Sequence, residues 1–218
     1  MKIINEITIS IIRNVGDGDT IHNLSKRIGF AYSAVYKWIN ILEDYNVIHI
    51  IKKGNKNVIK INDKNIIYNK FIELGNAIDI IDKDRIFWKF IKKIKLHIRF
   101  VKGTAVVIWT QGGYITGDFS DRIYFLEVYK NDKHKLEDLL RKYNIAFSSE
   151  KIIEERPFIF IIIKKSFKIV KMNNLPVMPL SELVLWCKKL HLENILEHLD
   201  LLYNLKLNAK YSEIRTNV

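Results

Sequence analysis

The sequence contains few of the residues that build disulfide frameworks and flexible linkers. Cys187 is the one cysteine among 218 residues, so no disulfide can form within the chain. Only three prolines and nine glycines are present, which argues against a long flexible linker. No apolar run approaches the roughly 20 residues of a membrane-spanning helix, and the N-terminus lacks the apolar core of a signal peptide. These absences predict a soluble cytoplasmic protein with no membrane partner.

Positive charge is the strongest feature of what is present. The chain has 36 Lys and Arg against 24 Asp and Glu, a formal net charge of +12. Such a balance favours a polyanionic partner, either nucleic acid or an anionic membrane surface. The alternative explanation is an Ile-, Lys- and Asn-heavy composition imposed by an AT-rich genome.

The first sixty residues predict three helices followed by a β-hairpin. Residues 3–12 have helical periodicity, and the sequence GDGD at 16–19 breaks that helix. A second helix follows at 20–28, with Asp19 or Thr20 as its cap and Gly29 at its end. In a third helix, 31–45, the spacing of Val35, Ile39 and Leu42 directs them to a core. Two β-rich arms then flank a Lys-Gly-Asn-Lys-Asn tip within 48–61.

This order resembles the winged helix-turn-helix superfamily over about 60 residues. The stretch LSKRIGFAYSAVYKWINILEDYNVI (24–48) matches its second and third helices. Asn46 stands where such domains often have Gly, and Asn is the next-best residue for a left-handed backbone. The resemblance implies that the chain binds double-stranded DNA, with the third helix in the major groove and the hairpin on the phosphate backbone.

The resemblance also implies which residues contact DNA. The candidates on the second and third helices are Lys26, Arg27, Tyr32, Ser33, Tyr36, Lys37 and Asn40, and those on the hairpin are Lys52, Lys53, Asn55 and Lys56. The exposed face has no acidic residue before Glu43, so nothing on it repels phosphate. A winged helix that binds protein instead of DNA is the alternative.

Residues 64–100 are predicted to form a helical connector, with helices at 64–81 and 82–99. Between residues 86 and 102 there are six basic residues and no acid. Arg85, Lys89, Lys92 and Arg99 define a possible secondary basic face. This face has three interpretations: an ordinary solvated surface, a second DNA contact or dimer interface, or a membrane-surface helix.

From residue 101 the pattern changes to short apolar runs typical of a compact α/β domain. Strands are predicted at 104–109, 122–129 and 157–164, with weaker ones near 145–147 and 167–170. Runs that are apolar on both faces indicate a sheet that is covered on both sides. A helix is expected at 132–143, a break at 175–179, and two short helices after it. The fold class is therefore α+β: a winged helix-turn-helix (1–63), a helical connector (64–100) and an α/β domain with a mixed sheet (101–218).

The stretch QGGYITGDFSDRIYFLEV (111–128) resembles the minimal nucleotidyltransferase superfamily in its glycines. Trp109, Gly112, Gly113, Gly117, Ser120 and Asp121 fit the outline of that family's loop. Its metal chemistry needs two carboxylates one residue apart on a strand, with a third nearby. Here Ile123 stands where the partner of Asp121 should be, and Glu127 stands alone. The sequence therefore predicts no catalytic residue, metal or cofactor. Two interpretations of the domain follow: a degenerate nucleotidyltransferase-like relative without catalysis, or a loop that only connects strands and uses Gly and Asp for its turn geometry. A further alternative is a divergent enzyme that uses Asp118, Asp121 and Glu127.

The order of the two domains, with NLPVMPLSELVLWCKKL (174–190) near the end, also resembles the antitoxin-regulators encoded beside nucleotidyltransferase toxins. That resemblance implies a DNA-binding transcriptional regulator, expected as a homodimer. Its C-terminal half would dimerise or sense a small-molecule or protein effector. Cys187 lies in an apolar helix beside Trp186, so a buried, unreactive thiol is predicted.

Overall fold

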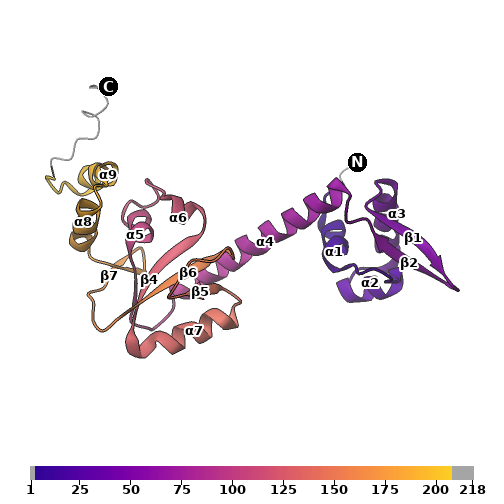
Figure 1. Ribbon diagram of the computed structural model, residues 1–218, viewed down its shortest axis with the longest axis horizontal. Coiled ribbons are helices and arrows are strands. Elements are labelled where there is room, and N and C mark those ends of the chain that lie inside the picture. The colour runs from indigo at the N-terminus through magenta and orange to yellow at the C-terminus, as the bar shows by residue number, and fades with distance from the viewer. Residues whose placement is uncertain (1–2, 208–218) are drawn as a thin grey trace, which may run out of the picture. The chain divides into compact units, whose positions relative to one another are not determined.

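A computed structural model describes residues 3–207, and it has a mixed α and β architecture (Figure 1). The chain divides into two compact units, the first ending at Asp79 and the second beginning at Ile80. Within residues 3–207 no helix combines the length and the apolar character needed to cross a membrane.

The first unit consists of helices around a small core, followed by a two-stranded hairpin. Its elements are α1 (Glu6–Asn14), α2 (Ile21–Ile28), α3 (Tyr32–Asp44), β1 (Ile48–Lys53), β2 (Lys56–Ile61) and the first part of α4 (Ile66–Ile91). The core contains the predicted inward residues Val35, Ile39 and Leu42, all with no exposed surface. Phe71 of α4 joins the same cluster.

Local hydrogen bonds fix where these helices begin and end. Asn5 caps α1 because its Oδ1 accepts hydrogen bonds from the amides of Ile7 (3.0 Å) and Thr8 (3.1 Å). Thr20 caps α2 by accepting from the Asn23 amide at 3.2 Å, as the sequence predicted. The predicted left-handed end of α2 is confirmed at Gly29, with φ of 74°.

Strands β1 and β2 form the predicted antiparallel hairpin, with Lys53 opposite Lys56 at its tip. The GDGD turn is attached to this hairpin by backbone hydrogen bonds. The Gly18 amide donates to the Ile59 carbonyl (2.8 Å), and the Ile59 amide donates to the Asp19 carbonyl (2.7 Å). The turn before α2 therefore holds β2 beside the helices.

Helix α4 differs from the two helices predicted in this region. It runs without interruption from Ile66 to Ile91 and passes through Gly75. A Cβ at Gly75 would lie 3.2 Å from Cδ of Arg13, whose guanidinium pairs with Asp79. The glycine thus makes room for the Arg13 side chain instead of ending the helix. The predicted helix 82–99 and the connector 64–100 are wrong at their C-terminal ends, because β3 (Ile98–Phe100) lies there.

The second unit contains a six-stranded sheet, and the prediction of a mixed sheet is confirmed. After β3 come α5 (Lys102–Trp109), α6 (Gly117–Ser120), β4 (Ile123–Tyr129), a 3-10 turn (Lys130–Asp132), α7 (Lys133–Lys142), β5 (Ala146–Ser148), β6 (Phe158–Lys164), β7 (Val170–Met172), β8 (Leu175–Val177), α8 (Leu180–Lys189) and α9 (Glu193–Tyr203). The strand order is β5-β6-β4-β3-β8-β7. The β3–β4 and β7–β8 pairs are antiparallel, and the other pairs are parallel.

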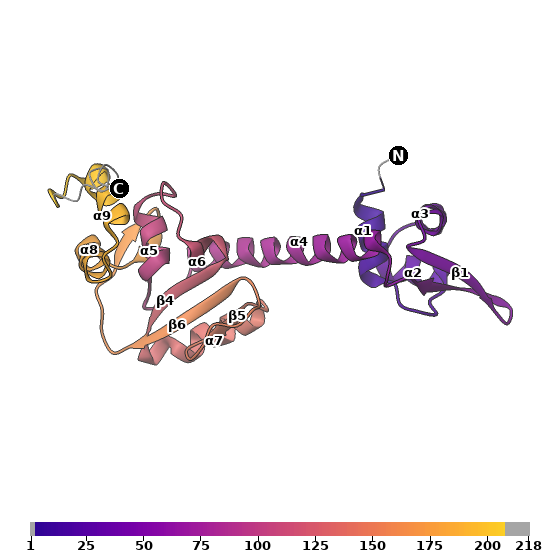
Figure 2. The ribbon, with the colours of Figure 1, turned by 45° about the horizontal axis from the view of Figure 1, so that its top comes forward.

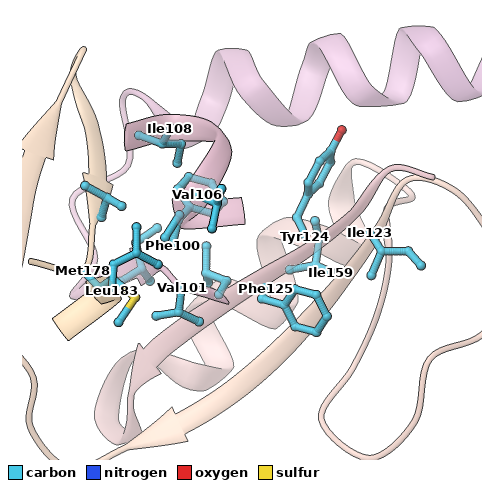
Figure 3. Close-up of a cluster of buried hydrophobic side chains, with 14 of the residues drawn as sticks. Phe100, Val101, Val106, Ile108, Ile123, Tyr124, Phe125, Ile159, Met178 and Leu183 are labelled. Atoms are coloured by element: carbon cyan, nitrogen blue, oxygen red, sulfur yellow. The ribbon is translucent and has the colours of Figure 1, made fainter. Parts of the chain in front are cut away.

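Helices cover both faces of this sheet. Figure 2 shows α7 on one side of β4 and β6, with α5 and α6 on the opposite side. Accordingly, all residues from Ile123 to Val128 in β4 are buried. Figure 3 shows Phe100 and Val106 in one apolar cluster with Met178 and Leu183, so the strand, α5 and the start of α8 share a core.

The predicted strand at 104–109 is wrong, because these residues form helix α5. Every residue from Gly103 to Trp109 is buried, so the helix has no polar face to reveal its period. A hydrogen bond holds it in place, because Thr104 Oγ1 accepts from the Phe125 amide at 2.9 Å. The helix also lies close to Thr116, since a Cβ on Gly103 would be only 2.9 Å from Thr116 Oγ1.

The predicted break at 175–179 is also wrong at its start, because Leu175–Val177 form strand β8. Asn173 and Asn174 connect it to β7 in left-handed conformations, with φ of 50° and 64°. Two such residues in succession make the tight turn of a β-hairpin.

Cys187 should not react with thiol reagents in the folded protein. Its side chain has no exposed surface, and burial raises the pKa of the thiol from 9.0 to about 12. We expect no alkylation by iodoacetamide at pH 8 without denaturant and complete alkylation in urea, measured by mass spectrometry. Rapid alkylation of the native protein would contradict the burial.

The same burial makes the stability of the folded protein depend on pH. Because the folded state excludes the thiolate, the contribution of Cys187 to the free energy of unfolding is complete below about pH 9 and is lost as pH rises towards 12. Cys187→Ala should make this loss of stability less steep.

Candidate nucleic-acid interface

Helix α3 has one face in the core and one in solvent. Val35, Ile39 and Leu42 have no exposed surface, so residues a half-turn away must face outward. Of the predicted contact residues on α3, Tyr32, Ser33, Tyr36 and Lys37 are exposed and Asn40 is half-buried. The structure therefore places this predicted set on a single polar surface.

Aromatic stacking orders part of that surface. Tyr32 is 50% exposed and Tyr36 is 45% exposed, yet their rings stack with centroids 6.0 Å apart and planes 22° apart. The ring of His22, from α2, lies 6.4 Å from Tyr32. Because each ring limits the motion of the next, the phenol hydroxyls are held on the solvent side of α3.

The hairpin provides the positive charge. Lys52, Lys53, Asn55 and Lys56 are all exposed on it. Lys53 and Lys56 lie directly opposite each other across the strands, and like charges in such a pair destabilise a hairpin. A hairpin selected only for stability would avoid this pair, whereas an anionic partner would neutralise both ammonium groups.

Two acidic residues near this surface, Glu43 and Asp17, make structural contacts. Glu43 Oε1 accepts from the Ile50 amide at 2.8 Å and so attaches β1 to α3. Asp17 Oδ1 accepts from the Ile61 amide at 2.7 Å. These carboxylates hold the hairpin beside α3 through backbone amides, and they do not neutralise the charge of its exposed lysines.

A cleft of about 450 Å³ lies where α2, α3 and the hairpin meet. It brings together Tyr32, Tyr36 and Lys56 from the predicted set. Its lining also includes His22, Asn23 and Asn57, which the sequence analysis did not identify. The inward spacing of Ile21, Leu24 and Ile28 places His22 and Asn23 on the outer face of α2. The helical period of α2 could therefore have identified both residues as exposed.

Two predicted residues on α2 lie outside this cleft. Lys26 and Arg27 are exposed near the end of the helix. Arg27 forms an ion pair with Asp19, so much of its charge is already balanced. Lys26 is therefore the stronger candidate of the two for a phosphate contact.

The predicted secondary basic face does not form on one helix. Arg85 and Lys89 are exposed on α4, and Arg85 lies 3.6 Å from Asp82. Lys92 follows the end of the helix. Arg99 is the clear error, because it lies in β3 with only 7% of its side chain exposed. The assignment failed because the helical period was extended beyond Ile91.

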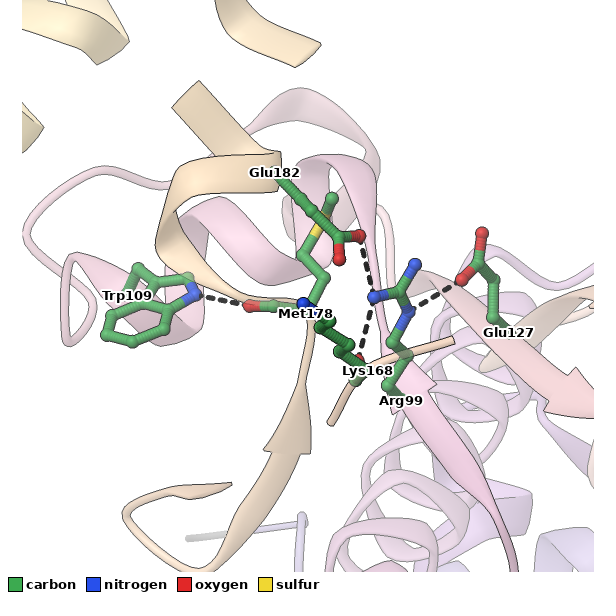
Figure 4. Close-up of polar contacts among 6 residues, drawn as sticks. All are labelled: Arg99, Trp109, Glu127, Lys168, Met178 and Glu182. Carbon is green, nitrogen blue, oxygen red and sulfur yellow. Dashed lines mark hydrogen bonds and ion pairs between the residues drawn. The ribbon is translucent and has the colours of Figure 1, made fainter. Parts of the chain in front are cut away.

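Arg99 is instead the centre of a buried polar cluster (Figure 4). Its Nε donates to Glu127 Oε2 at 2.6 Å. Its Nη1 donates to Glu182 Oε2 at 2.7 Å and to the Lys168 carbonyl at 2.8 Å. The ring of Phe167 lies 5.0 Å from the guanidinium carbon. One side chain thus connects β3, β4, α8 and the segment before β7.

The carboxylates of the alternative enzyme interpretation do not gather around a common point. Asp118 lies on α6 and Asp121 directly after it, both exposed, whereas Glu127 is buried and bonded to Arg99. Within residues 3–207, no three His, Cys, Asp or Glu side chains are placed to hold a metal ion together. The geometry required by that interpretation is therefore not found in this part of the chain.

Comparison of the chain with protein-family models, with curated proteins and with solved structures finds no match. Functional argument therefore depends on the geometry of the chain itself.

Replacing Arg99 should strongly destabilise the second unit. Arg99→Met leaves Glu127 buried without its partner, at a cost of about 3–5 kcal/mol in the free energy of unfolding. The double variant Arg99→Met/Glu127→Leu should recover most of this loss, because neither charge remains buried. Urea denaturation measures both. Arg85→Met is the control, since its side chain is 78% exposed. Equal effects of Arg99→Met and Arg85→Met would contradict the role of the cluster.

Proposed function

We propose that this protein is a DNA-binding transcriptional regulator whose first unit is a winged helix. The observation that carries the proposal is the exposed surface of α3 from Tyr32 to Asn40, which is polar and aromatic and carries no acid, beside a hairpin that carries exposed lysines. In a winged helix, α3 would enter the major groove and the hairpin would contact phosphates. The protein would act in the cytoplasm, and its second unit would regulate this binding.

The side chains of this surface suit such a role. Tyr, Ser, Asn and Lys offer hydrogen-bond donors to base edges and phosphates. The lysines would release counterions from the duplex, so affinity should fall steeply with salt. A protein-binding winged helix would instead expose aliphatic side chains on α3. Tyr32, Ser33, Tyr36 and Lys37 hold the outward positions, which favours DNA.

Charge reversal on this surface should weaken DNA binding. For Lys37→Glu/Lys53→Glu, we expect at least a tenfold lower affinity for a duplex. The slope of log affinity against log salt should become shallower by about 0.9 for each phosphate that the variant no longer neutralises. Fluorescence anisotropy with a labelled duplex of mixed sequence measures both quantities.

The matched control has the same change in net charge at exposed lysines of α8, Lys188→Glu/Lys189→Glu. It should bind DNA nearly as the wild type does, because its lysines lie in the second unit. Circular dichroism confirms that each variant is folded. Equal weakening by both pairs would mean that only net charge matters, and the assigned surface would then be wrong.

The proposal includes a homodimer, and the first unit offers a surface for it. Ile3, Ile4, Ile66, Ile67, Phe71 and Leu74 line an apolar groove of about 280 Å³ with Lys70. Ile66 is 74% exposed. Lys70 and Glu73 lie one turn apart on α4 and pair at 2.7 Å. In an antiparallel contact between two copies, each Lys70 would meet Glu73 of the other copy, which makes the surface self-complementary.

Reversal of one charge should disrupt this dimer, and reversal of both should restore it. Lys70→Glu places like charges across the two-fold axis, whereas Lys70→Glu/Glu73→Lys exchanges them. Sedimentation velocity should show a shift to monomer for the single variant and a dimer for the double variant. Ile66→Glu should also give monomer. A protein that remains dimeric in all three variants would exclude this groove as the interface.

A further inference from the structure

A cavity of about 380 Å³ in the second unit has the composition of a small-molecule site. Its lining combines apolar, aromatic and polar side chains. The apolar ones, Val107, Ile108 and Leu175, are buried or half-buried, and the aromatic walls, Trp88 and Phe119, are half-buried. The exposed polar residues, which form the rim, are Lys92, Gln111 and Asn173. Ligand sites are commonly of this size and combine apolar surface with a few placed polar groups.

The aromatic walls are held in fixed positions. The rings of Trp88 and Phe119 have centroids 5.9 Å apart, with planes at 41°. Behind them, Trp88 packs edge-on against Tyr124 at 5.0 Å and lies 5.2 Å from Phe100. Tyr124 is anchored in turn by a 2.6 Å hydrogen bond to Asp84. Rings supported in this way can stack on a flat ligand without first becoming ordered.

The rim carries one cation and two amides. Lys92 is exposed, and among residues 3–207 no carboxylate lies within ion-pair distance of its ammonium group. Gln111 and Asn173 each offer a donor and an acceptor. An anionic group on a ligand would meet Lys92, and polar ring atoms would meet the amides.

The backbone of Gln111 has a conformation that favours glycine. It follows the end of α5 with φ of 52°, a left-handed conformation in which glutamine is unusual. Glycine is the usual residue at such a position, and Gly112 stands directly after it. Residues held in this conformation cluster at functional sites. Gln111 is one of ten non-glycine residues with positive φ among residues 3–207, and its place in the lining of the cavity is what makes it a candidate.

From these features we infer that the cavity binds a small ligand that combines a planar aromatic ring with an anionic group. The ring stacks on one of the two aromatic side chains, Trp88 or Phe119, and contacts the other at its edge. The anion pairs with Lys92, and Gln111 and Asn173 select the polar atoms of the ring. This inference does not rest on DNA binding and extends beyond it. The loop that begins QGG thereby has a role in recognition that needs no metal.

The test is calorimetric titration of the full chain without DNA. The probes are adenosine monophosphate and indole-3-acetate, which share an aromatic ring and an anion but come from different chemical sources. Adenosine and inorganic phosphate are the controls, because each has only one of the two features. At least one ring-bearing anion should saturate the protein, with both controls binding about tenfold more weakly or not at all. If no ring-bearing anion saturates the protein at millimolar concentration, or if the controls bind equally well, the inference is overturned.

Variants at the rim then separate recognition from folding. Lys92→Met should weaken the anion about tenfold, whereas Lys164→Met, on β6 and outside this cavity, should not. Gln111→Gly should raise the melting temperature by relieving the left-handed backbone, and yet lower ligand affinity. Affinity that is unchanged in both Lys92→Met and Gln111→Gly would show that the ligand binds elsewhere. Gel shift with and without the ligand is a separate measurement, so failure of DNA binding would leave this result intact.

Discussion

The buried guanidinium of Arg99 links four segments of the second unit through hydrogen bonds with fixed directions. It is placed opposite Glu127 in the β3–β4 pair and also bonds to Glu182 at the start of α8. A charge at that depth is tolerated only if its hydrogen bonds are satisfied. Strands β3 and β4, helix α8 and the Lys168 carbonyl must therefore keep one geometry. The apolar core can then pack around a frame that polar directionality has already specified.

Polar side chains also fix the geometry of the first unit, there without a buried ion pair. Glu43 and Asp17 hold the hairpin to the helices through backbone amides, and Asn5 and Thr20 cap α1 and α2. These polar groups are used for structure and lie outside the tyrosine and lysine surface. A rigid frame with a separate, uncommitted polar surface suits recognition, because the surface can vary without loss of the fold.

Local signals made the first unit readable from the sequence. Helix caps, the glycine at position 29 and the inward period of Val35, Ile39 and Leu42 are each encoded within a few residues. Helix α5 could not be predicted in this way, because a helix that is buried on all sides has the same apolar run as a strand. The prediction that Arg99 lies on an exposed basic face was wrong for a related reason. The partners of Arg99 lie 28 and 83 residues away in the chain, and no local pattern reveals such pairs.

Some residues that line the candidate cleft were predicted from the sequence. The winged-helix resemblance implied Tyr32, Tyr36 and Lys56 but did not imply Asn57. The contribution of Asn57 depends on how the hairpin lies against α2 and α3, which is a tertiary property. The cavity in the second unit could be predicted even less from local sequence, since its lining comes from α4, α5, α6 and the turn before β8.

The pair of lysines at the hairpin tip has a further energetic consequence. Lys53 and Lys56 repel each other whenever the hairpin is formed without a partner, so the free protein stores a small electrostatic strain there. An anion seated between the two ammonium groups would release that strain. Part of the binding energy would then originate in the unbound fold rather than in new contacts. The hairpin tip would therefore be most ordered when a negatively charged partner lies against it.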